Sequence, residues 1–394
     1  MKPADAKAAA APRRILYVHN SADLYGASRS LLRLLTALDR TRFDPSVVLP
    51  EHGILEERIK ALGTSVTIEP ALAIISRYSS KLGAIFYRFP VSSWRLFRLI
   101  RRKRIDLVHT NTGVVFSPAF AAWIACVPHV WHIRESFEEF GGGLWEVYSA
   151  FMRAFSARIV SVSHPNAAQF ADRRKVVVIH NGFPLEDFPA FTNEQRRQAR
   201  AHFDLAETDL VTGCVGRLKW VRKGQEFLIQ AAHLLKGRGW QMKHLIVGSP
   251  YTGNESHLER LQALVRELGL EKEIIFAGEL RDTRSAYAAM DLFVLPSAQP
   301  EPFGGVVIEA MAHRLPVIAT SIGGSLDQVE DGVTGLLVPP AEPKALADAI
   351  ELLARDDGRR KQMGIAGRER VAQLFDLKQM VIRTQNLYED ILRG

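Results

Sequence analysis

The sequence predicts an α/β protein with two domains in series, each built on a parallel β-sheet covered by helices. Short apolar runs of strand length alternate with helical patterns, as expected for parallel strands joined by right-handed crossovers. The alternation stops once, at Asn181–Pro189, and then begins again. The chain has 394 residues, which is too long for one ordinary hydrophobic core.

In the first half, the predicted strands share short apolar runs bounded by polar or glycine-containing turns. They are Ile15–Val18, Ser46–Leu49, Val66–Ile68, Leu107–His109, Val130–His132, Ile159–Ser161 and Val176–Ile179. A periodic helix is predicted at Leu31–Leu38, after the first strand.

In the second half, the predicted strands have the same character. They are Leu210–Val215, Leu245–Val247, Ile274–Phe276, Leu292–Val294 and Pro316–Ile318. Helices are predicted at Lys223–Leu235, His257–Leu268 and Val306–Ala312, and a helix-rich tail at Lys344–Arg393.

The interruption divides the chain into four parts. We expect a disordered tail at 1–13, an N-terminal domain at 14–185, a C-terminal domain at 186–369 and a C-terminal helix at 370–394. Ligands of open α/β sheets bind outside the carboxyl ends of the strands. Residues that directly follow strands are therefore the functional candidates.

Composition restricts the compartment and the class of protein. Hydrophobic residues make up 47% and charged residues 24%, as in ordinary globular proteins. The two cysteines, Cys126 and Cys214, lie in apolar runs and are predicted to be free thiols. The N-terminus lacks the apolar core of a signal peptide, and no run has the length of a spanning helix. We expect a cytoplasmic protein.

The strongest functional signal is the segment Glu301–Ala312, which follows a predicted strand. Gly304 and Gly305 allow a ligand to approach the backbone where a helix begins, and the free N–H groups there suit a diphosphate. Glu301 and Glu309 each provide a carboxylate that accepts two hydroxyl protons, which suits the vicinal diols of a sugar and a ribose. The alternative is a loop glutamate and a solvated helix glutamate.

A second signal, Gly216–Gly224, follows the first strand of the second half. Arg217 and Lys223 are predicted to neutralise a diphosphate, one with a planar fork and the other as a point charge. The chain has no Asp-x-Asp triplet, so we expect no metal and no other cofactor. The alternative is a basic loop that faces solvent.

The pairs Gly216-Arg217 and Lys223-Gly224, the glutamates Glu301 and Glu309, and the motif Gly332–Leu337 resemble the family 4 retaining glycosyltransferases of the GT-B fold. The likeness spans nearly the whole chain and is weakest at about Ala71–Trp94. It implies two facing Rossmann-like domains with a cleft between them, and a C-terminal helix that crosses back to the N-terminal domain.

The resemblance also implies roles for residues. Arg217 and Lys223 would hold the diphosphate of a nucleotide-sugar donor, Glu301 the sugar and Glu309 the ribose. Backbone groups near Gly278 and Leu280 would hold the base. The remaining donor-binding candidates are Gly26, Gly216, Phe303, Gly304 and Gly305.

In the N-terminal domain, the resemblance points to one histidine that faces the donor sugar. His132 matches best and His109 is the weaker candidate. The family often has two adjacent glycines in its first loop, whereas this chain has only Gly26. No covalent nucleophile stands out, and the departing phosphate would help to deprotonate the acceptor.

The net charge of +8 has a local origin. Nine basic and no acidic residues lie between Pro70 and Ile105, whereas the rest of the chain has 42 basic and 43 acidic residues. A helix is predicted at Ser92–Arg104, with Arg95, Arg98 and Arg102 on one face. That face is either a solvated helix surface or a patch for anionic lipid headgroups. A lipid patch would make the protein peripheral at the inner face of a membrane, with a lipid-linked acceptor.

The expected activity is transfer of a sugar from a nucleotide sugar to a glycan or lipid-linked acceptor. A nucleotide-sugar epimerase of the same architecture and a non-catalytic sugar-nucleotide-binding protein are the alternatives. A Rossmann dehydrogenase would need G-x-G-x-x-G after a strand, which neither Asp23–Ser28 nor Gly213–Arg217 provides. No signature of a nucleic-acid-binding fold accompanies the basic segment.

Overall fold

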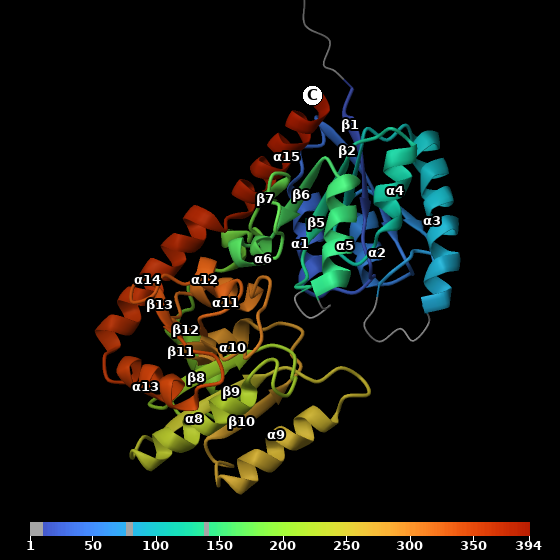
Figure 1. Ribbon diagram of the computed structural model, residues 1–394. Coiled ribbons are helices and arrows are strands. Elements are labelled where there is room, and N and C mark those ends of the chain that lie inside the picture. Colours follow the sequence, from blue (N-terminus) through green and yellow to red (C-terminus); the bar gives the residue numbers. More distant parts are fainter. Residues whose placement is uncertain (1–10, 76–81, 138–141) are drawn as a thin grey trace, which may run out of the picture. The chain divides into compact units, whose positions relative to one another are not determined.

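The computed structural model describes residues 11–75, 82–137 and 142–394, which form two compact α/β units (Figure 1). The first unit contains the chain up to Val162, Ala167–Gly182 and Leu377–Gly394. The second contains Ser163–Asn166 and Phe183–Asp376. The units therefore divide at Gly182, close to the division predicted after residue 185.

The first unit is built on a seven-stranded sheet whose recorded strand pairs are all parallel. Its order is β3-β2-β1-β4-β5-β6-β7. The strands are β1 (Arg13–Val18), β2 (Phe43–Leu49), β3 (Ser65–Ile68), β4 (Leu107–Thr110), β5 (His129–Ile133), β6 (Arg158–Ser161) and β7 (Val176–Val178).

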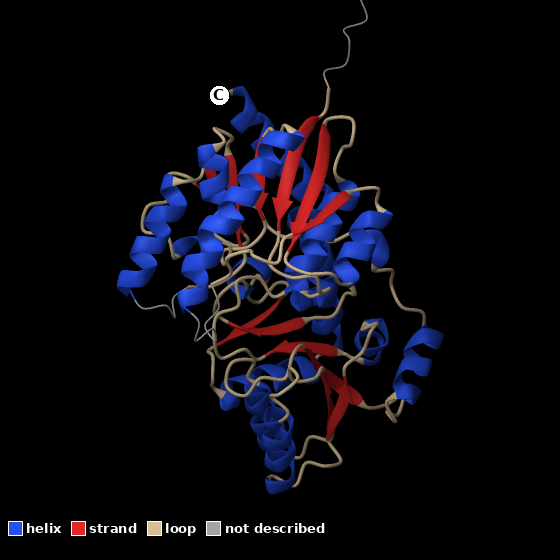
Figure 2. Cartoon of the chain, turned by 90° about the vertical axis from the view of Figure 1, so that its right-hand side faces the viewer, coloured by secondary structure: helices blue, strands red, loops and turns tan. Residues whose placement is uncertain are grey.

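Helices cover both faces of this sheet, so side chains on both faces of a strand are buried (Figure 2). In β1, Ile15 and Tyr17 pack toward α1, α2 and α15, whereas Leu16 and Val18 pack toward α3 and α4. The helices are α1 (Gly26–Ala37), α2 (Ile54–Ala61), α3 (Leu82–Lys103), α4 (Ser117–Ile124), α5 (Gly142–Ala154) and α15 (Leu377–Arg393). The short α6 (His164–Ala168) is divided between the two units.

The second unit is built on a six-stranded sheet of the order β10-β9-β8-β11-β12-β13, again with parallel pairs. The strands are β8 (Leu210–Val215), β9 (Met242–Val247), β10 (Ile274–Gly278), β11 (Leu292–Leu295), β12 (Val317–Thr320) and β13 (Gly335–Val338). β13, which the sequence analysis quoted only as part of a motif, forms the edge of this sheet.

One core of this unit lies under α7, α10, α11 and α14, and the other under α8, α9 and α13. The helices are α7 (Asn193–His202), α8 (Gln225–Gly237), α9 (Ser256–Glu267), α10 (Arg284–Ala289), α11 (Gly305–Ala312), α12 (Ser325–Gln328), α13 (Pro343–Ala354) and α14 (Asp357–Leu374).

The C-terminal helices divide between the units. Val371 and Phe375, in and just after α14, are buried in the core of the second unit. α15 belongs to the first unit, where Met380 and Tyr388 enter the core beside α1. The change of unit therefore occurs at Leu377, not at residue 370 as predicted.

Each sheet has one position where the order of strands reverses. β1 lies between β2 and β4, and β8 lies between β9 and β11. The connections that leave neighbouring strands there diverge to opposite faces, which leaves a crevice at the carboxyl edge where ligands of such sheets bind. The loops after β1 and β4, and after β8 and β11, are the places where a site is expected.

Candidate active site

In the second unit, the two loops at the reversal of strand order carry the strongest predicted residues. Gly216–Gly224 follows β8, and the segment from Pro296 to Gly304 follows β11. The loops are joined by their backbones, because the N–H groups of Ala298 and Gln299 donate to the carbonyl of Arg222, at 3.1 and 3.3 Å. Candidate residues that are far apart in the sequence are therefore held close together at this edge of the sheet.

Lys223 and Glu301 form an ion pair across these loops. The Lys223 Nζ atom lies 2.7 Å from Glu301 Oε2, and Ser297 Oγ donates to Oε1 of the same carboxylate. Burial alone would raise the pKa of Glu301, but the ammonium of Lys223 and the two hydrogen bonds hold that pKa below its ordinary value. Glu301 is therefore a carboxylate at neutral pH.

Gly224 permits the close approach of the two loops. Its φ of +69° lies in the left-handed region, and a Cβ there would lie 1.8 Å from the carbonyl oxygen of Pro296. Nearby, Val221 is held at φ 64°, which is unusual for a β-branched residue. A strained backbone beside a candidate site is common where a loop must be held in one conformation.

A third loop, which follows β12, supports the backbone of Glu301. Gly323, after β12, has a φ of +57°, and a Cβ there would lie 2.4 Å from the Glu301 carbonyl oxygen. The N–H of Gly324 donates to the same oxygen at 2.7 Å. The backbone of Glu301 is thus fixed from a third strand end.

The predicted partner Arg217 lies in a different local environment. Its guanidinium stacks over the ring of Tyr251, at 4.0 Å from the centroid. The turn that precedes Arg217 is tight, since a Cβ on Gly248 would lie 1.9 Å from the carbonyl oxygen of Gly216. Among the described residues, no ion pair joins Arg217 to Glu301, so Lys223 rather than Arg217 is the cation at this carboxylate.

Glu309 lies in α11 and accepts a hydrogen bond of 3.1 Å from the hydroxyl of Tyr287. Gly304 is the N-cap of this helix and Gly305 its first residue. Phe303 packs against the core through Phe183 and Phe375, which anchors the start of the helix.

The predicted base-binding residues lie at the end of β10. Gly278 is exposed, has a φ of +69° and accepts a hydrogen bond of 2.7 Å from the N–H of Gly248. Leu280 is partly buried against the core. Both lie at the same sheet edge as Lys223 and Glu301.

In the first unit, a buried chain of hydrogen bonds joins the loops at the reversal of strand order. Arg134 donates to Asn111 Oδ1 at 2.9 and 3.0 Å, and Asn111 Nδ2 lies 3.2 Å from His19 Nδ1. His19 Nε2 lies 3.0 Å from Ser28 Oγ, which donates to Asp23 at 2.8 Å. Each link has a donor and an acceptor if His19 is neutral, with its proton on Nε2. Burial lowers the pKa of His19 to about 4, in agreement.

Arg134 is a partly buried cation held mainly by amide oxygens. A further hydrogen bond of 2.6 Å runs from its Nη1 to Asn181 Oδ1, which also accepts from Ser30 at 2.8 Å. Burial lowers the pKa of Arg134 to about 10, so it remains charged at neutral pH. No motif in the sequence pointed to Arg134, Asn111 or His19. Their shared position directly after strands is the signal that could have identified them.

His132 lies within β5 and is buried, beside the ring of His109. Burial lowers the pKa of both histidines well below the ordinary value, so both are neutral. The residue that follows the strand is Arg134, whose Nη2 lies 3.5 Å from His132 Nδ1. The catalytic role of His132 stays a prediction.

Two other predictions fall in the first unit. Gly26 begins α1 and is exposed. Arg95, Arg98 and Arg102 are exposed on α3, and Arg95 forms an ion pair of 3.0 Å with Glu69. The likeness that was weakest at Ala71–Trp94 includes residues 76–81, which lie outside the described residues.

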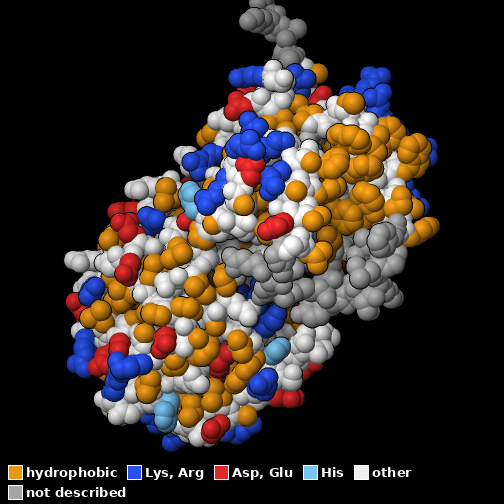
Figure 3. Space-filling model, viewed as in Figure 1, with side chains coloured by type: hydrophobic (Ala, Val, Ile, Leu, Met, Phe, Trp, Pro, Cys, Tyr) orange, Lys and Arg blue, Asp and Glu red, His pale blue; other side chains and the backbone are white. Residues whose placement is uncertain are grey.

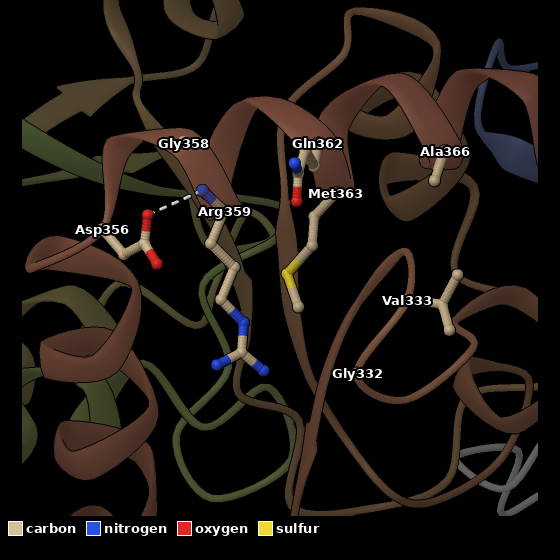
Figure 4. A pocket seen from close by; sticks show the side chains of 8 residues that line it. All are labelled: Gly332, Val333, Asp356, Gly358, Arg359, Gln362, Met363 and Ala366. Carbon is tan, nitrogen blue, oxygen red and sulfur yellow. Dashed lines mark hydrogen bonds between the residues drawn. The ribbon is translucent and has the colours of Figure 1, made fainter.

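A pocket of about 690 Å³ lies elsewhere on the second unit, between α14 and the loop before β13 (Figure 4). Arg359, Gln362 and Met363 line one side, and Gly332 and Val333 the other. Gly332 and Val333 belong to the motif noted in the sequence, but none of the predicted donor-binding residues lines this pocket.

Two family models match the chain. The model described as Glycosyltransferase Family 4 matches residues 25–187, and the model described as Glycosyl transferases group 1 matches residues 195–370. The first matched range ends at residue 187, shortly after the division at Gly182, and the second lies wholly within the second unit.

Curated relatives are similar over part of their length. A capsular polysaccharide biosynthesis glycosyltransferase, CapM of Staphylococcus aureus, is 30% identical over 230 residues, 57% of this chain and 58% of the relative. A D-inositol 3-phosphate glycosyltransferase of Mycobacteroides abscessus is 37% identical over 188 residues, 47% of this chain and 40% of the relative. The chain thus spans about half the length of the curated relatives it matches.

Solved structures share the fold. The Anabaena protein Alr3699/HepE, in complex with UDP, aligns with a TM-score of 0.82 and 23% identity over 96% of this chain and all of that one. A glycosyltransferase of Rickettsia africae aligns with a TM-score of 0.83 and 21% identity over 97% of this chain and 99% of that one. The predicted fold of two parallel-sheet α/β domains is confirmed.

Proposed function

The chain belongs to the family 4, group 1 glycosyltransferases, and we propose that it transfers a sugar from a nucleoside-diphosphate sugar to a glycan or lipid-linked acceptor. The observation that carries the proposal is the Lys223–Glu301 pair, held where the strand order of the second sheet reverses. A cation and an anion fixed together at that edge suit a ligand with a diphosphate and sugar hydroxyls.

The proposed chemistry assigns one task to each side chain. Lys223 neutralises the negative charge that develops on the departing diphosphate, with the N–H groups at the start of α11 as further donors. Glu301 accepts protons from hydroxyls of the transferred sugar, and Glu309 from the ribose. Because the chain supplies this charge itself, we propose that turnover needs no metal.

We further propose that the anomeric configuration is retained and that the leaving phosphate takes the proton of the acceptor hydroxyl. Retention is the outcome in the family that the motifs resemble. UDP is the first nucleotide to test, because crystals of Alr3699/HepE hold UDP and UDP-glucose.

Proton NMR tests the proposal. The protein is incubated in EDTA with UDP-glucose and with an acceptor fraction, which is either a lipid extract or a polysaccharide preparation. We expect donor loss, UDP release and a new α-linked anomeric signal. A β-linked product would contradict retention, and recovery of activity only after addition of Mg²⁺ would contradict metal independence. No consumption of any nucleotide sugar in a panel, by a folded sample, would contradict the transferase proposal.

Variants localise the activity. Lys223→Ala is expected to lower turnover about 100-fold, the usual effect of losing one stabiliser of transition-state charge. Lys344→Ala is the matched control, since Lys344 makes an exposed ion pair with Asp348 on α13 of the same unit. Equal turnover in the two variants would exclude Lys223 from the mechanism.

A further inference from the structure

Large apolar side chains are exposed together on one side of the first unit. Tyr87 and Trp94 on α3 are 72% and 60% exposed, Trp123 on α4 is 59% exposed and Leu144 on α5 is 73% exposed. Figure 3 shows hydrophobic side chains gathered over these three helices. We define the aromatic face as Tyr87, Trp94, Trp123, Ile124, Leu144 and Val147.

A layer of partly buried aromatic rings supports the aromatic face. Phe89 of α3 stacks on Phe116, directly before α4, at 4.9 Å between centroids. Phe120 of α4 stacks on Trp123 at 5.6 Å, and Trp123 contacts Phe155, directly after α5, edge to face at 5.4 Å. The exposed rings are thus mounted on a packed surface that joins the three helices.

One stripe of α3 changes from apolar to cationic along its length. Tyr87, Trp94, Arg98 and Arg101 follow one another at helical spacing, so they share a side of the helix. Among the described residues, the ion pairs of α3 involve Arg95, with Glu69, but not Arg98, Arg101 or Arg102.

Charge around the aromatic face is predominantly positive. The segment from Pro70 to Ile105 contains no acidic residue. The acidic residue Glu146 is exposed on α5 between Leu144 and Val147, whereas the arginines lie on a different helix, α3.

We propose that the aromatic face docks onto the surface of an anionic phospholipid membrane, with Arg98, Arg101 and Arg102 against the headgroups. Exposed tryptophan and tyrosine beside arginine suit the boundary between headgroups and acyl chains. None of the helices in the described ranges is long and apolar enough to cross a bilayer, so this contact is interfacial. A second copy of the chain is a poorer occupant, because two such faces would bring like charges together.

The proposal deepens the proposed function, on which its biological meaning rests, because a lipid-linked acceptor would be presented at this surface. Its test is independent of sugar transfer. Full-length protein is sedimented with vesicles of phosphatidylcholine alone or with 30 mol % phosphatidylglycerol, without donor or acceptor. We expect binding to the anionic vesicles that weakens as salt is raised.

Two double variants separate the apolar and cationic contributions. Trp94→Ser with Trp123→Ser is expected to weaken binding at least about tenfold through loss of buried apolar area. Arg98→Gln with Arg101→Gln is expected to weaken it about fivefold per arginine at low salt. The matched controls are Ile365→Ser on α14 and Arg383→Gln on α15, which are exposed elsewhere and are expected to bind as the wild type.

Three results would overturn the proposal. One is equal sedimentation with neutral and anionic vesicles, and another is an equal loss of binding in the control variants. The third is a dimer, measured by light scattering, that the tryptophan variant abolishes while vesicle binding is unchanged. Thermal shifts with UDP, recorded on the same samples, show whether the donor site is intact, so failure of this proposal is distinguishable from failure of the transferase.

Discussion

Gly224 is the residue on which the position of Lys223 depends most directly. Its left-handed backbone and its contact with the Pro296 carbonyl leave no room for a side chain. Gly224→Ala is therefore expected to lower the free energy of unfolding of the second unit by at least about 1–2 kcal/mol from backbone conformation alone. It is also expected to weaken UDP binding, because the position of Lys223 changes. Thermal unfolding and titration with UDP measure the two effects.

The control for this substitution is Gly237→Ala at the end of α8, where a Cβ would meet nothing within 4 Å. It is expected to change stability by less than about 1 kcal/mol, in the stabilising direction. Wild-type UDP affinity in Gly224→Ala would show that the loop contact does not position Lys223.

At this scale, the sequence identified Lys223 and Glu301 as candidates but not as partners. Their ion pair depends on Gly224, Gly323 and Ser297, which come from loops distant in sequence. The predicted role of Arg217 at the diphosphate stays a prediction, and its cation–π contact with Tyr251 depends on a neighbouring loop that no spacing rule reveals. Arg134 lies two residues after His132, yet only the fold shows that it directly follows the strand.

At the scale of elements, α15 stabilises the unit to which it returns. The Tyr388 hydroxyl lies 2.6 Å from His109 Nδ1 and 3.1 Å from the Tyr17 hydroxyl, all fully buried. Tyr388→Phe leaves both partners without their hydrogen bond, which costs about 1–3 kcal/mol. Urea unfolding should show this loss, whereas Tyr87→Phe, on the exposed side of α3, should unfold as the wild type. Equal stability of the two variants would mean that water replaces the lost bonds.

Periodicity predicted most strands because buried parallel strands are short apolar runs. It did not predict the start of α3 or the strand β13. Pro90 made the start of α3 difficult to predict, and the helix in fact runs from Leu82 to Lys103. β13 has only four residues and begins with a glycine, so its strand character depends on pairing with β12. The aromatic face could not be predicted, since α3, α4 and α5 form one surface only in the folded unit.

At the scale of the molecule, buried histidines with lowered pKa values are more numerous in the described part of the first unit than in that of the second, where burial lowers the pKa values of His244 and His313 to about 4. In the first unit, burial lowers the pKa of His19 to about 4 and that of His129 to about 3, and burial also lowers the pKa values of His109 and His132 well below the ordinary value. The unfolded chain binds protons near pH 6.5, so stability is fully present above that pH and is lost as pH falls toward the folded values.

We therefore expect the first unit to be the more acid-sensitive. Each such histidine contributes a slope of up to about 1.4 kcal/mol per pH unit below pH 6.5. Calorimetry between pH 7.5 and 5 should show that the unfolding temperature of the first unit falls more than that of the second. The transition that Tyr388→Phe lowers is assigned to the first unit. A parallel decline of both transitions would contradict this expectation.

We propose that Lys223, paired with Glu301 in the second unit, holds the diphosphate of the donor without a metal. Isothermal titration of wild type, Lys223→Ala and Lys344→Ala with UDP, all in EDTA, tests it most directly. We predict that wild type and Lys344→Ala bind UDP alike and that Lys223→Ala binds at least tenfold more weakly. Equal affinity in all three proteins, or binding by wild type only after Mg²⁺ is added, would contradict the claim.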